Sequence, residues 1–266
     1  MRLKLTLVPK HRGCKIPINY QYPLSAAIYR ILSSASPEYA EFLHQKGYLT
    51  EQGKPQKLFT FSYLSGMKFR NGVLNALPHQ ECILYVSSPM IEDFIQNLVI
   101  GLFENQEIAI GNHLVTGRFQ VAQVESEVTP NFLPETQFKC LSPFVVSTMK
   151  ERDGRLQPHY LRPDDPELSE AVRQNLVRKF ETVYQTPPTD TNLSLHFDET
   201  YVKKRGGYHK ITKLITLKEH HETETTHIKG IFAPFILTGS TELMLVAWEA
   251  GLGSRCSQGF GCVGVL

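Results

Sequence analysis

The order of apolar and polar residues predicts alternating strands and helices in the first half of the chain. Residues 2–9 alternate basic or polar side chains with apolar ones, which is the two-residue period of a strand. Residues 23–34 carry apolar side chains on one helix face, at Leu24, Ile28 and Ile31. Ser36 and Pro37 then predict the start of a second, short helix, because serine is a good N-cap and proline suits the first helical position.

The first half of the chain should end at a domain junction. Residues 58–64 and 81–86 are predicted strands, a helix should begin after Ser88, and residues 114–124 form the predicted closing strand. Periodicity lapses between residues 125 and 134, a stretch that contains two prolines. We therefore expect a first domain at residues 1–128 and a second at residues 136–266.

The second half repeats the order of elements without repeating the sequence. We expect a strand at residues 137–149, a helix from Asp165-Pro166 onward and a long β-hairpin at residues 193–238. A last helix should run from Ser240 to Ala250, and a final strand should occupy residues 260–266. The fold class is therefore α+β, with two tandem ferredoxin-like βαββαβ domains of the RRM-like kind. Because this architecture serves many functions, individual residues must indicate the function.

Composition narrows the class of protein without deciding between an enzyme and a binding module. At 266 residues, 41% of them apolar, the chain can build two cores, and it contains no apolar run long enough for a membrane span, so we expect a soluble protein. Five cysteines without a Cys-x-x-Cys pair fit reduced thiols in the cytoplasm. A net charge of only +2 means that any attraction to nucleic acid must come from local patches.

The most unusual segment is a glycine-rich tail, with five glycines from Gly251 to Gly264 inclusive. Glycines let a backbone approach a ligand closely and leave N–H groups free to contact phosphate oxygens. The segment is neither a dinucleotide fingerprint nor a Walker loop, since it follows a helix and contains no Gly-Lys-Ser/Thr. A purely structural role in a helix cap, a turn and a bulge remains open. The candidate RNA-binding residues here are Gly251, Gly253, Ser254, Arg255, Ser257, Gly259 and Gly261.

The pattern Gly-x-Gly-x-x-x-Ser-x-Gly-Phe-Gly-x-Val at residues 251–263 closely resembles that of the CRISPR-associated repeat-processing endoribonucleases. These are tandem ferredoxin-like proteins of the repeat-associated RNA-binding superfamily. The family often has an aromatic residue where this chain has Leu252. At the other end, residues 19–32, Ser36-Pro37, Phe42-Leu-His44 and Lys57-Leu-Phe-Thr-Phe61 resemble the family's N-terminal block in order and spacing.

The resemblance implies an active site made of a tyrosine, a histidine and a lysine. By position these are Tyr29 on the first helix, His44 at the end of the second and Lys57 at the entry to the second strand. The chemistry is reasonable because RNA carries its own nucleophile, so the enzyme need only move protons and stabilise the phosphorane charge, without a metal or cofactor. The implied products are a 2′,3′-cyclic phosphate and a 5′-hydroxyl. Taken singly, each residue also fits an ordinary structural role.

Two further segments attract attention. Lys203, Lys204 and Arg205 begin a basic stretch around two glycines, which we interpret as a hairpin tip that grips an RNA backbone, although a solvated turn fits equally well. The stretch from His220 to His227 places His221 and His227 on one strand face, but a solvent-facing strand is favoured and we assign no metal.

The main functional hypothesis is a metal-independent endoribonuclease that cleaves CRISPR precursor RNA within the repeat to produce guide RNAs. The expected partner is CRISPR repeat RNA, with other CRISPR-associated proteins and a homodimer left open, and no membrane. The alternative is a non-cleaving subunit that binds repeat RNA as part of a CRISPR ribonucleoprotein. A metal-dependent nuclease using the His220 to His227 stretch is a weaker third hypothesis.

Overall fold

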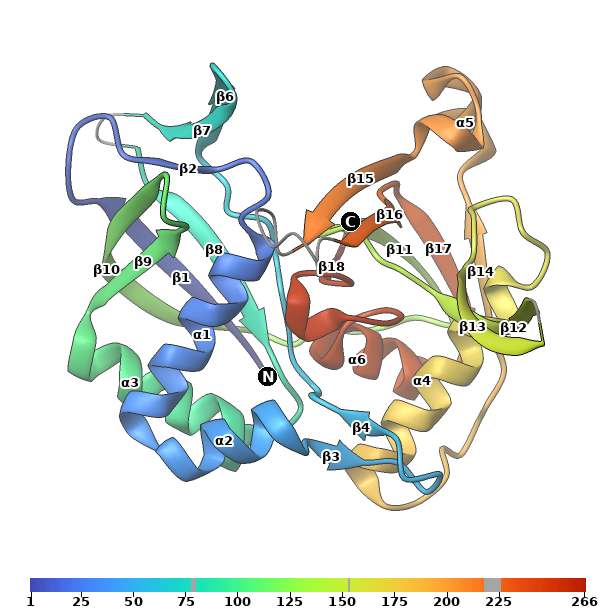
Figure 1. Ribbon diagram of the computed structural model, residues 1–266. Helices are drawn as coiled ribbons and strands as arrows, with labels where there is room; N and C mark the ends of the chain where they lie inside the picture. The colour runs from blue at the N-terminus through green and yellow to red at the C-terminus, as the bar shows by residue number, and fades with distance from the viewer. Residues whose placement is uncertain (78–79, 153, 218–225) are drawn as a thin grey trace.

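Two sheets, each with helices packed on one face, lie side by side (Figure 1). The computed structural model describes residues 1–266 except 78–79, 153 and 218–225. The first unit contains the five-stranded sheet β5-β8-β1-β10-β9 and the second the four-stranded sheet β14-β17-β11-β18. Both contain the antiparallel strand order of a ferredoxin-like domain, so the predicted fold class is confirmed.

The first unit follows the predicted order of elements closely. Its sheet strands are β1 (Arg2–Pro9), β5 (Thr60–Phe61), β8 (Cys82–Ser87), β9 (Glu107–Gly111) and β10 (Thr116–Glu127). Its helices are α1 (Gln21–Ala35), α2 (Pro37–Gln45) and α3 (Gln96–Asn105), the last preceded by the π-helical turn η1 (Ile91–Ile95). Helix α2 begins as predicted, because the Ser36 hydroxyl accepts a hydrogen bond from the Tyr39 N–H at 3.2 Å.

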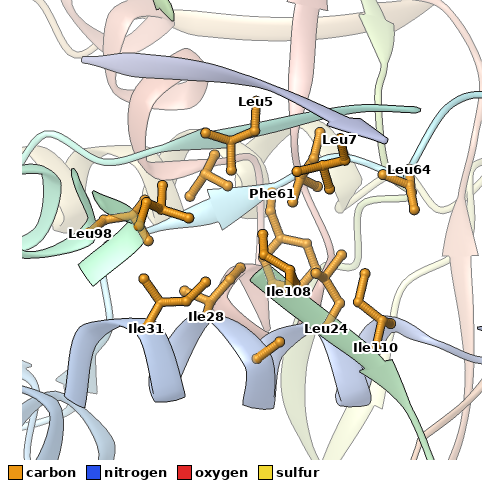
Figure 2. Packing of buried hydrophobic residues seen from close by; sticks show 14 of the residues in the cluster. Leu5, Leu7, Leu24, Ile28, Ile31, Phe61, Leu64, Leu98, Ile108 and Ile110 are labelled. Carbon is orange, nitrogen blue, oxygen red and sulfur yellow. The ribbon is translucent and has the colours of Figure 1, made fainter. Parts of the chain in front are cut away.

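The core of the first unit is formed between the sheet and the helices α1 and α3. In Figure 2 the apolar stripe of α1 and side chains of the sheet strands face a single interior. All the labelled side chains are buried: Leu5, Leu7, Leu24, Ile28, Ile31, Phe61, Leu64, Leu98, Ile108 and Ile110. The apolar residues found at helical and strand spacing in the sequence therefore pack into a single core.

The second unit has the same plan. Its sheet strands are β11 (Glu135–Cys140), β14 (Leu193–Phe197), β17 (Phe235–Gly239) and β18 (Val263–Val265), covered by α4 (Leu168–Tyr184) and α6 (Thr241–Ala250). Ser240 caps α6 as predicted, since its hydroxyl accepts a hydrogen bond from the Leu243 N–H at 3.3 Å. Val172 and Leu176 of α4 point into the core together with Val246 of α6.

Two predicted elements of the second unit are wrong. Residues 137–149 are not one strand, because β11 ends at Cys140 and β12 (Ser147–Arg152) pairs instead with β13 (Arg155–Tyr160). Pro143 lies between them and has no N–H with which to continue a ladder.

The predicted hairpin at residues 193–238 is interrupted. Strands β14 and β17 do pair, but the helix α5 (Glu199–Arg205), the 3₁₀ turn η2 (Tyr208–Lys210) and the separate hairpin of β15 (Thr212–Leu217) and β16 (Thr226–Ile231) lie between them. Asp198 starts α5 by accepting hydrogen bonds from two backbone N–H groups, and Gly206 ends it in the left-handed conformation.

Small additions to the first unit were not foreseen. The strands β3 (Tyr48–Leu49) and β4 (Pro55–Gln56) form a hairpin after α2, and β2 (Lys15–Pro17), β6 (Met67–Arg70) and β7 (Val73–Ala76) form a separate sheet. Of the predicted strand at residues 58–64, only the two residues of β5 join a ladder. Within the described ranges, every helix is too short or too polar to cross a membrane.

The two units are joined by residues 128–134 and held together by a buried guanidinium. Arg2 on β1 is 1% exposed and donates hydrogen bonds to the carbonyl oxygens of Trp248 at 2.6 Å and Val263 at 2.7 Å in the second unit. Its guanidinium also lies 4.2 Å from the centre of the Trp248 ring. The N-terminal amine adds an ion pair with Glu249.

Replacing Arg2 with methionine should lower the free energy of unfolding by about 2 to 4 kcal/mol, because two charge-assisted hydrogen bonds across the units are lost and their carbonyl acceptors stay buried. Urea denaturation of Arg2→Met and wild type measures the difference. Lys4→Met is the control, since Lys4 lies on the same strand in a partly exposed ion pair with Glu125 and should change stability little. Equal effects of the two substitutions would contradict the role given to Arg2.

Candidate functional site

Tyr29 and His44 come together where the helices α1 and α2 meet. Their ring centres lie 5.4 Å apart in an edge-to-face arrangement, and the other side of Tyr29 packs on Phe59 at 5.8 Å. His44 occupies the last turn of α2 and is exposed, whereas Tyr29 is half-buried. The phenol therefore has a fixed position beside an imidazole that solvent and a ligand can reach.

Lys57 is brought to the same place by the chain that follows the β3–β4 hairpin. Its Nζ donates hydrogen bonds to the carbonyl oxygens of Leu43 and, at 2.7 Å, of His44. These are free carbonyls at the C-terminal end of α2, so the ammonium both satisfies them and complements the helix dipole. Lys57 thus lies against the backbone of His44, whose ring is in contact with Tyr29.

The backbone beside Lys57 is strained. Leu58 adopts a φ of +50°, which is unfavourable for a bulky residue, and its side chain is buried in the core of the second unit. The Ser88 hydroxyl donates a hydrogen bond to the Leu58 carbonyl oxygen at 2.7 Å. The core contact and this hydrogen bond hold the strained conformation, and with it the direction in which Lys57 leaves the chain.

Burial shifts the pKa values of two of the three groups. It raises the pKa of Tyr29 to about 12, so the phenol keeps its proton at neutral pH and can donate a hydrogen bond. It lowers the pKa of Lys57 from the usual lysine value. The arrangement therefore offers a phenol donor, an exposed imidazole and an amine held against two carbonyls.

A basic cleft of about 560 Å³ extends from Lys57 to the glycine-rich loop and to helix α4. Among the described residues, its lining includes five cationic side chains and no acidic one: Lys54, Lys57, Arg178, Lys179 and Arg255. The candidate RNA-binding residues Gly253, Ser254 and Ser257 also line it. A cleft with this charge suits a polyanion such as a nucleic-acid backbone.

The glycines of the loop are packed inside the protein. Gly251, Gly253, Gly259 and Gly261 all have positive φ values between 77° and 88° and are buried. A Cβ on Gly259 would lie 2.9 Å from the Cβ of Gln21 and from the Phe61 ring, both in the first unit. The glycines thus let the loop approach the other unit closely, while residues 254–258 between them line the cleft.

Lys179 holds this loop and was missed by sequence reasoning. It is 6% exposed, and its Nζ donates hydrogen bonds to the carbonyl oxygens of Ala250 at 3.3 Å, Gly251 at 2.6 Å and Gly253 at 2.9 Å. The sequence did contain a signal, because Lys179 follows Leu176 by three residues on the apolar face of α4. A lysine in such a stripe needs buried acceptors.

Arg255 is fixed at the wall of the cleft. Its Nε and one terminal nitrogen donate hydrogen bonds to the Tyr160 hydroxyl at 3.1 and 2.9 Å, and its other terminal nitrogen donates to Gln258 Oε1 at 2.9 Å. The loop is also tied to α1, because the Ser25 hydroxyl donates to the Ser257 carbonyl oxygen at 2.7 Å.

The other candidate segments lie elsewhere. Lys203, Lys204 and Arg205 are exposed, but they form the last turn of α5 and not the predicted hairpin tip, and Figure 1 places α5 at the opposite end of the molecule from α2. His220 and His221 lie outside the described residues. His227 lies on β16, with Nδ1 at 3.1 Å from the Thr216 hydroxyl. Among the described residues, no cluster of three or more His, Cys, Asp or Glu side chains is arranged to bind a metal ion.

Known protein families and individual proteins match this chain over nearly its whole length. The family model for the N-terminal part of the CRISPR-associated protein Cas6 matches residues 15–125, and that for the C-terminal part of CRISPR associated protein Cas6 matches residues 124–265. A CRISPR-associated endoribonuclease Cas6 1 from Methanocaldococcus jannaschii is 29% identical over 250 residues, which cover 93% of this chain and 86% of that protein.

A second relative and a solved structure are also similar to this chain over its full length. The CRISPR-associated endoribonuclease Cas6 from Pyrococcus furiosus is 26% identical over 270 residues, covering 100% of this chain and 90% of that one. A solved structure described as an RAMP protein binding different RNA substrates superposes with a TM-score of 0.78 at 23% identity, covering 100% of this chain and 99% of that one. At that identity the superposition supports the fold alone.

Gly259→Ala should destabilise the protein more than Gly53→Ala does. Both glycines have positive φ, +88° and +71°, so both substitutions carry the same kind of backbone strain, of about 1 kcal/mol. Only at Gly259 does the added Cβ meet other atoms, whereas Gly53 has none within 4 Å. Thermal unfolding of the two variants should therefore show the larger drop in melting temperature for Gly259→Ala, and equal drops would contradict the close packing of the loop.

Proposed function

Because the chain belongs to the Cas6 family of CRISPR-associated proteins, whose models match residues 15–125 and 124–265, we propose that it is an endoribonuclease that cleaves CRISPR repeat RNA. The observation that carries the proposal is that the Tyr29 and His44 rings are in contact, while Lys57, which binds the His44 carbonyl oxygen, lines a basic cleft. Residues 1–128 form the catalytic domain and residues 136–266 the domain that carries the glycine-rich RNA-binding loop. The relatives named as endoribonucleases support this function.

The reaction uses the 2′-hydroxyl of the RNA as nucleophile. Its oxygen bonds to the adjacent phosphorus, its proton passes to a base, and the bond from phosphorus to the 5′-oxygen breaks as that oxygen receives a proton. The products are a 2′,3′-cyclic phosphate and a 5′-hydroxyl. Since the substrate supplies the nucleophile and protein groups supply the proton transfers and the positive charge, no metal ion or cofactor takes part.

Each of the three side chains has a role in the reaction that follows from its surroundings. The exposed His44 imidazole moves a proton to or from the reacting oxygens. Tyr29, with its pKa raised to about 12, acts as a hydrogen-bond donor and not as the base. Lys57 has three N–H donors, of which two are taken by the carbonyls of Leu43 and His44, so one remains for the phosphorane oxygen.

The RNA backbone follows the basic side chains. Arg178 and Arg255 contact phosphates within the cleft, and Ser254 and Ser257 add hydroxyl donors along its wall. Lys203, Lys204 and Arg205 offer a second, exposed basic patch for a more distant part of the repeat.

Incubation of the protein with its repeat RNA in EDTA tests the function. We expect cleavage at a single position, with a 2′,3′-cyclic phosphate and a 5′-hydroxyl identified at the product ends. A 2′-deoxy nucleotide at that position should abolish cleavage, because the nucleophile is removed. Tight binding without cleavage would instead favour a non-cleaving subunit, and cleavage only after a divalent metal is added would contradict the metal-independent mechanism.

His44→Ala should slow single-turnover cleavage by about two to four decades, the usual contribution of a general acid or base, while RNA affinity stays nearly the same. The control is His11→Ala, which removes an exposed histidine in the turn after β1 and should leave the rate unchanged. A cleavage rate of His44→Ala equal to that of wild type would remove His44 from the mechanism.

A further inference from the structure

The basic cleft contains a concentration of unpaired polar atoms. In the described part of the chain, five enclosed side-chain nitrogen or oxygen atoms have no hydrogen-bond partner. Three of them belong to residues that line this one cleft: Gln56 Oε1, Thr148 Oγ1 and Asn175 Oδ1. Enclosed polar atoms in proteins almost always have partners, so three exceptions around one cleft indicate a ligand that supplies them.

These residues are brought together from distant parts of the chain. Gln56 ends strand β4 of the first unit, Thr148 lies on β12 and Asn175 lies in the middle of α4. Local sequence preferences do not explain why an unpaired polar atom occurs in each of three separate elements. All three residues line the same cleft, so a ligand bound in that cleft would account for all three unpaired atoms.

We propose that Gln56, Thr148 and Asn175 form a subsite that reads the base of a nucleotide next to the scissile phosphate, with a preference for adenine or cytosine over uracil. The inference rests on the proposed function and deepens it. Gln56 directly precedes Lys57, so a base bound at Gln56 belongs to a nucleotide adjacent to the phosphate held by Lys57. Phosphate contacts position RNA, whereas contacts to base edges give sequence preference.

The chemistry of the unpaired atoms selects the base. Amide oxygens accept hydrogen bonds, and adenine and cytosine both present an amino group beside a ring nitrogen that accepts one. A side-chain amide can match such an edge with its oxygen and its NH₂ group together. Uracil presents the opposite pattern, with a carbonyl oxygen in place of the amino group and an N–H in place of the accepting ring nitrogen. An amide of Gln56 or Asn175 held in the orientation seen here would therefore face uracil oxygen to oxygen and N–H to N–H.

Arg178 provides an internal comparison. It lines the same cleft, but a guanidinium on a phosphate makes the same contact whatever the base. Substitutions at Gln56, Thr148 and Asn175 should therefore alter base preference, and substitution at Arg178 should alter affinity alone.

The test measures binding of 2′-fluoro octanucleotides of A, C or U, which have no 2′-hydroxyl and cannot be cleaved, by fluorescence anisotropy. Wild type should bind the A and C octamers about 5- to 10-fold more tightly than the U octamer, as expected for one or two extra hydrogen bonds. Asn175→Leu, Gln56→Met and Thr148→Val, which keep size and remove hydrogen bonding, should each reduce that preference and leave U affinity within about 2-fold. Arg178→Gln should weaken all three octamers by a similar factor.

Thermal unfolding gives an independent readout. Because the three oxygens have no partner, the apolar replacements should leave the melting temperature unchanged or raise it. A clear loss of stability would show that the side chains serve the fold, and would overturn the proposal. Equal wild-type affinity for all three octamers, or an unchanged preference in all three variants, would overturn it as well.

Cleavage of the repeat RNA by wild type, measured in the same preparation, separates this inference from the proposed function. Cleavage without base preference leaves the endoribonuclease in place and removes the subsite. A base preference that the variants abolish, without cleavage, supports the subsite and contradicts the enzyme.

Discussion

Three cations, Arg2, Lys57 and Lys179, donate hydrogen bonds from buried or half-buried positions to backbone carbonyl oxygens, and the candidate site depends on all three. Burying a charge without partners costs several kcal/mol, so each of these side chains stays inside only while its carbonyls remain in place. Arg2 joins β1 to α6 and β18, Lys57 holds the end of α2, and Lys179 holds the start of the glycine-rich loop. The geometry around the cleft is therefore set by charge as much as by apolar packing.

This constraint explains why the cleft lies where the two units meet. Tyr29, His44 and Lys57 come from the first unit, whereas Arg178, Arg255 and the loop come from the second. The buried glycines bring the loop against α1 and β5, which leaves the cationic and hydroxyl side chains of the loop facing the opening. A ligand in the cleft would contact both units at once, so the stability of their contact and the shape of the binding site are linked.

Local sequence signals succeeded where an element makes its own hydrogen bonds. The helix cap at Ser36 and the apolar stripe of α1 each depend on residues a few positions apart in the chain, and the structure has them as predicted. The predictions for residues 137–149 and 193–238 were wrong because strand pairing depends on distant partners. Continuous β-type sequence there could not reveal which sheet each part would join.

The amino-acid sequence by itself determined the α+β class, the two ferredoxin-like units and the membership of a family, since all three rest on periodicity and on motifs at the ends of the chain. Only the tertiary structure decided that Lys57 caps the helix bearing His44, that Lys179 lies buried beneath the loop and that Gln56, Thr148 and Asn175 line one cleft. The physical reason is that these relations join residues far apart in the chain. Partners for a buried charge such as Lys57 or Lys179 exist only once the chain has folded, and those of Arg2 only once both units have packed together.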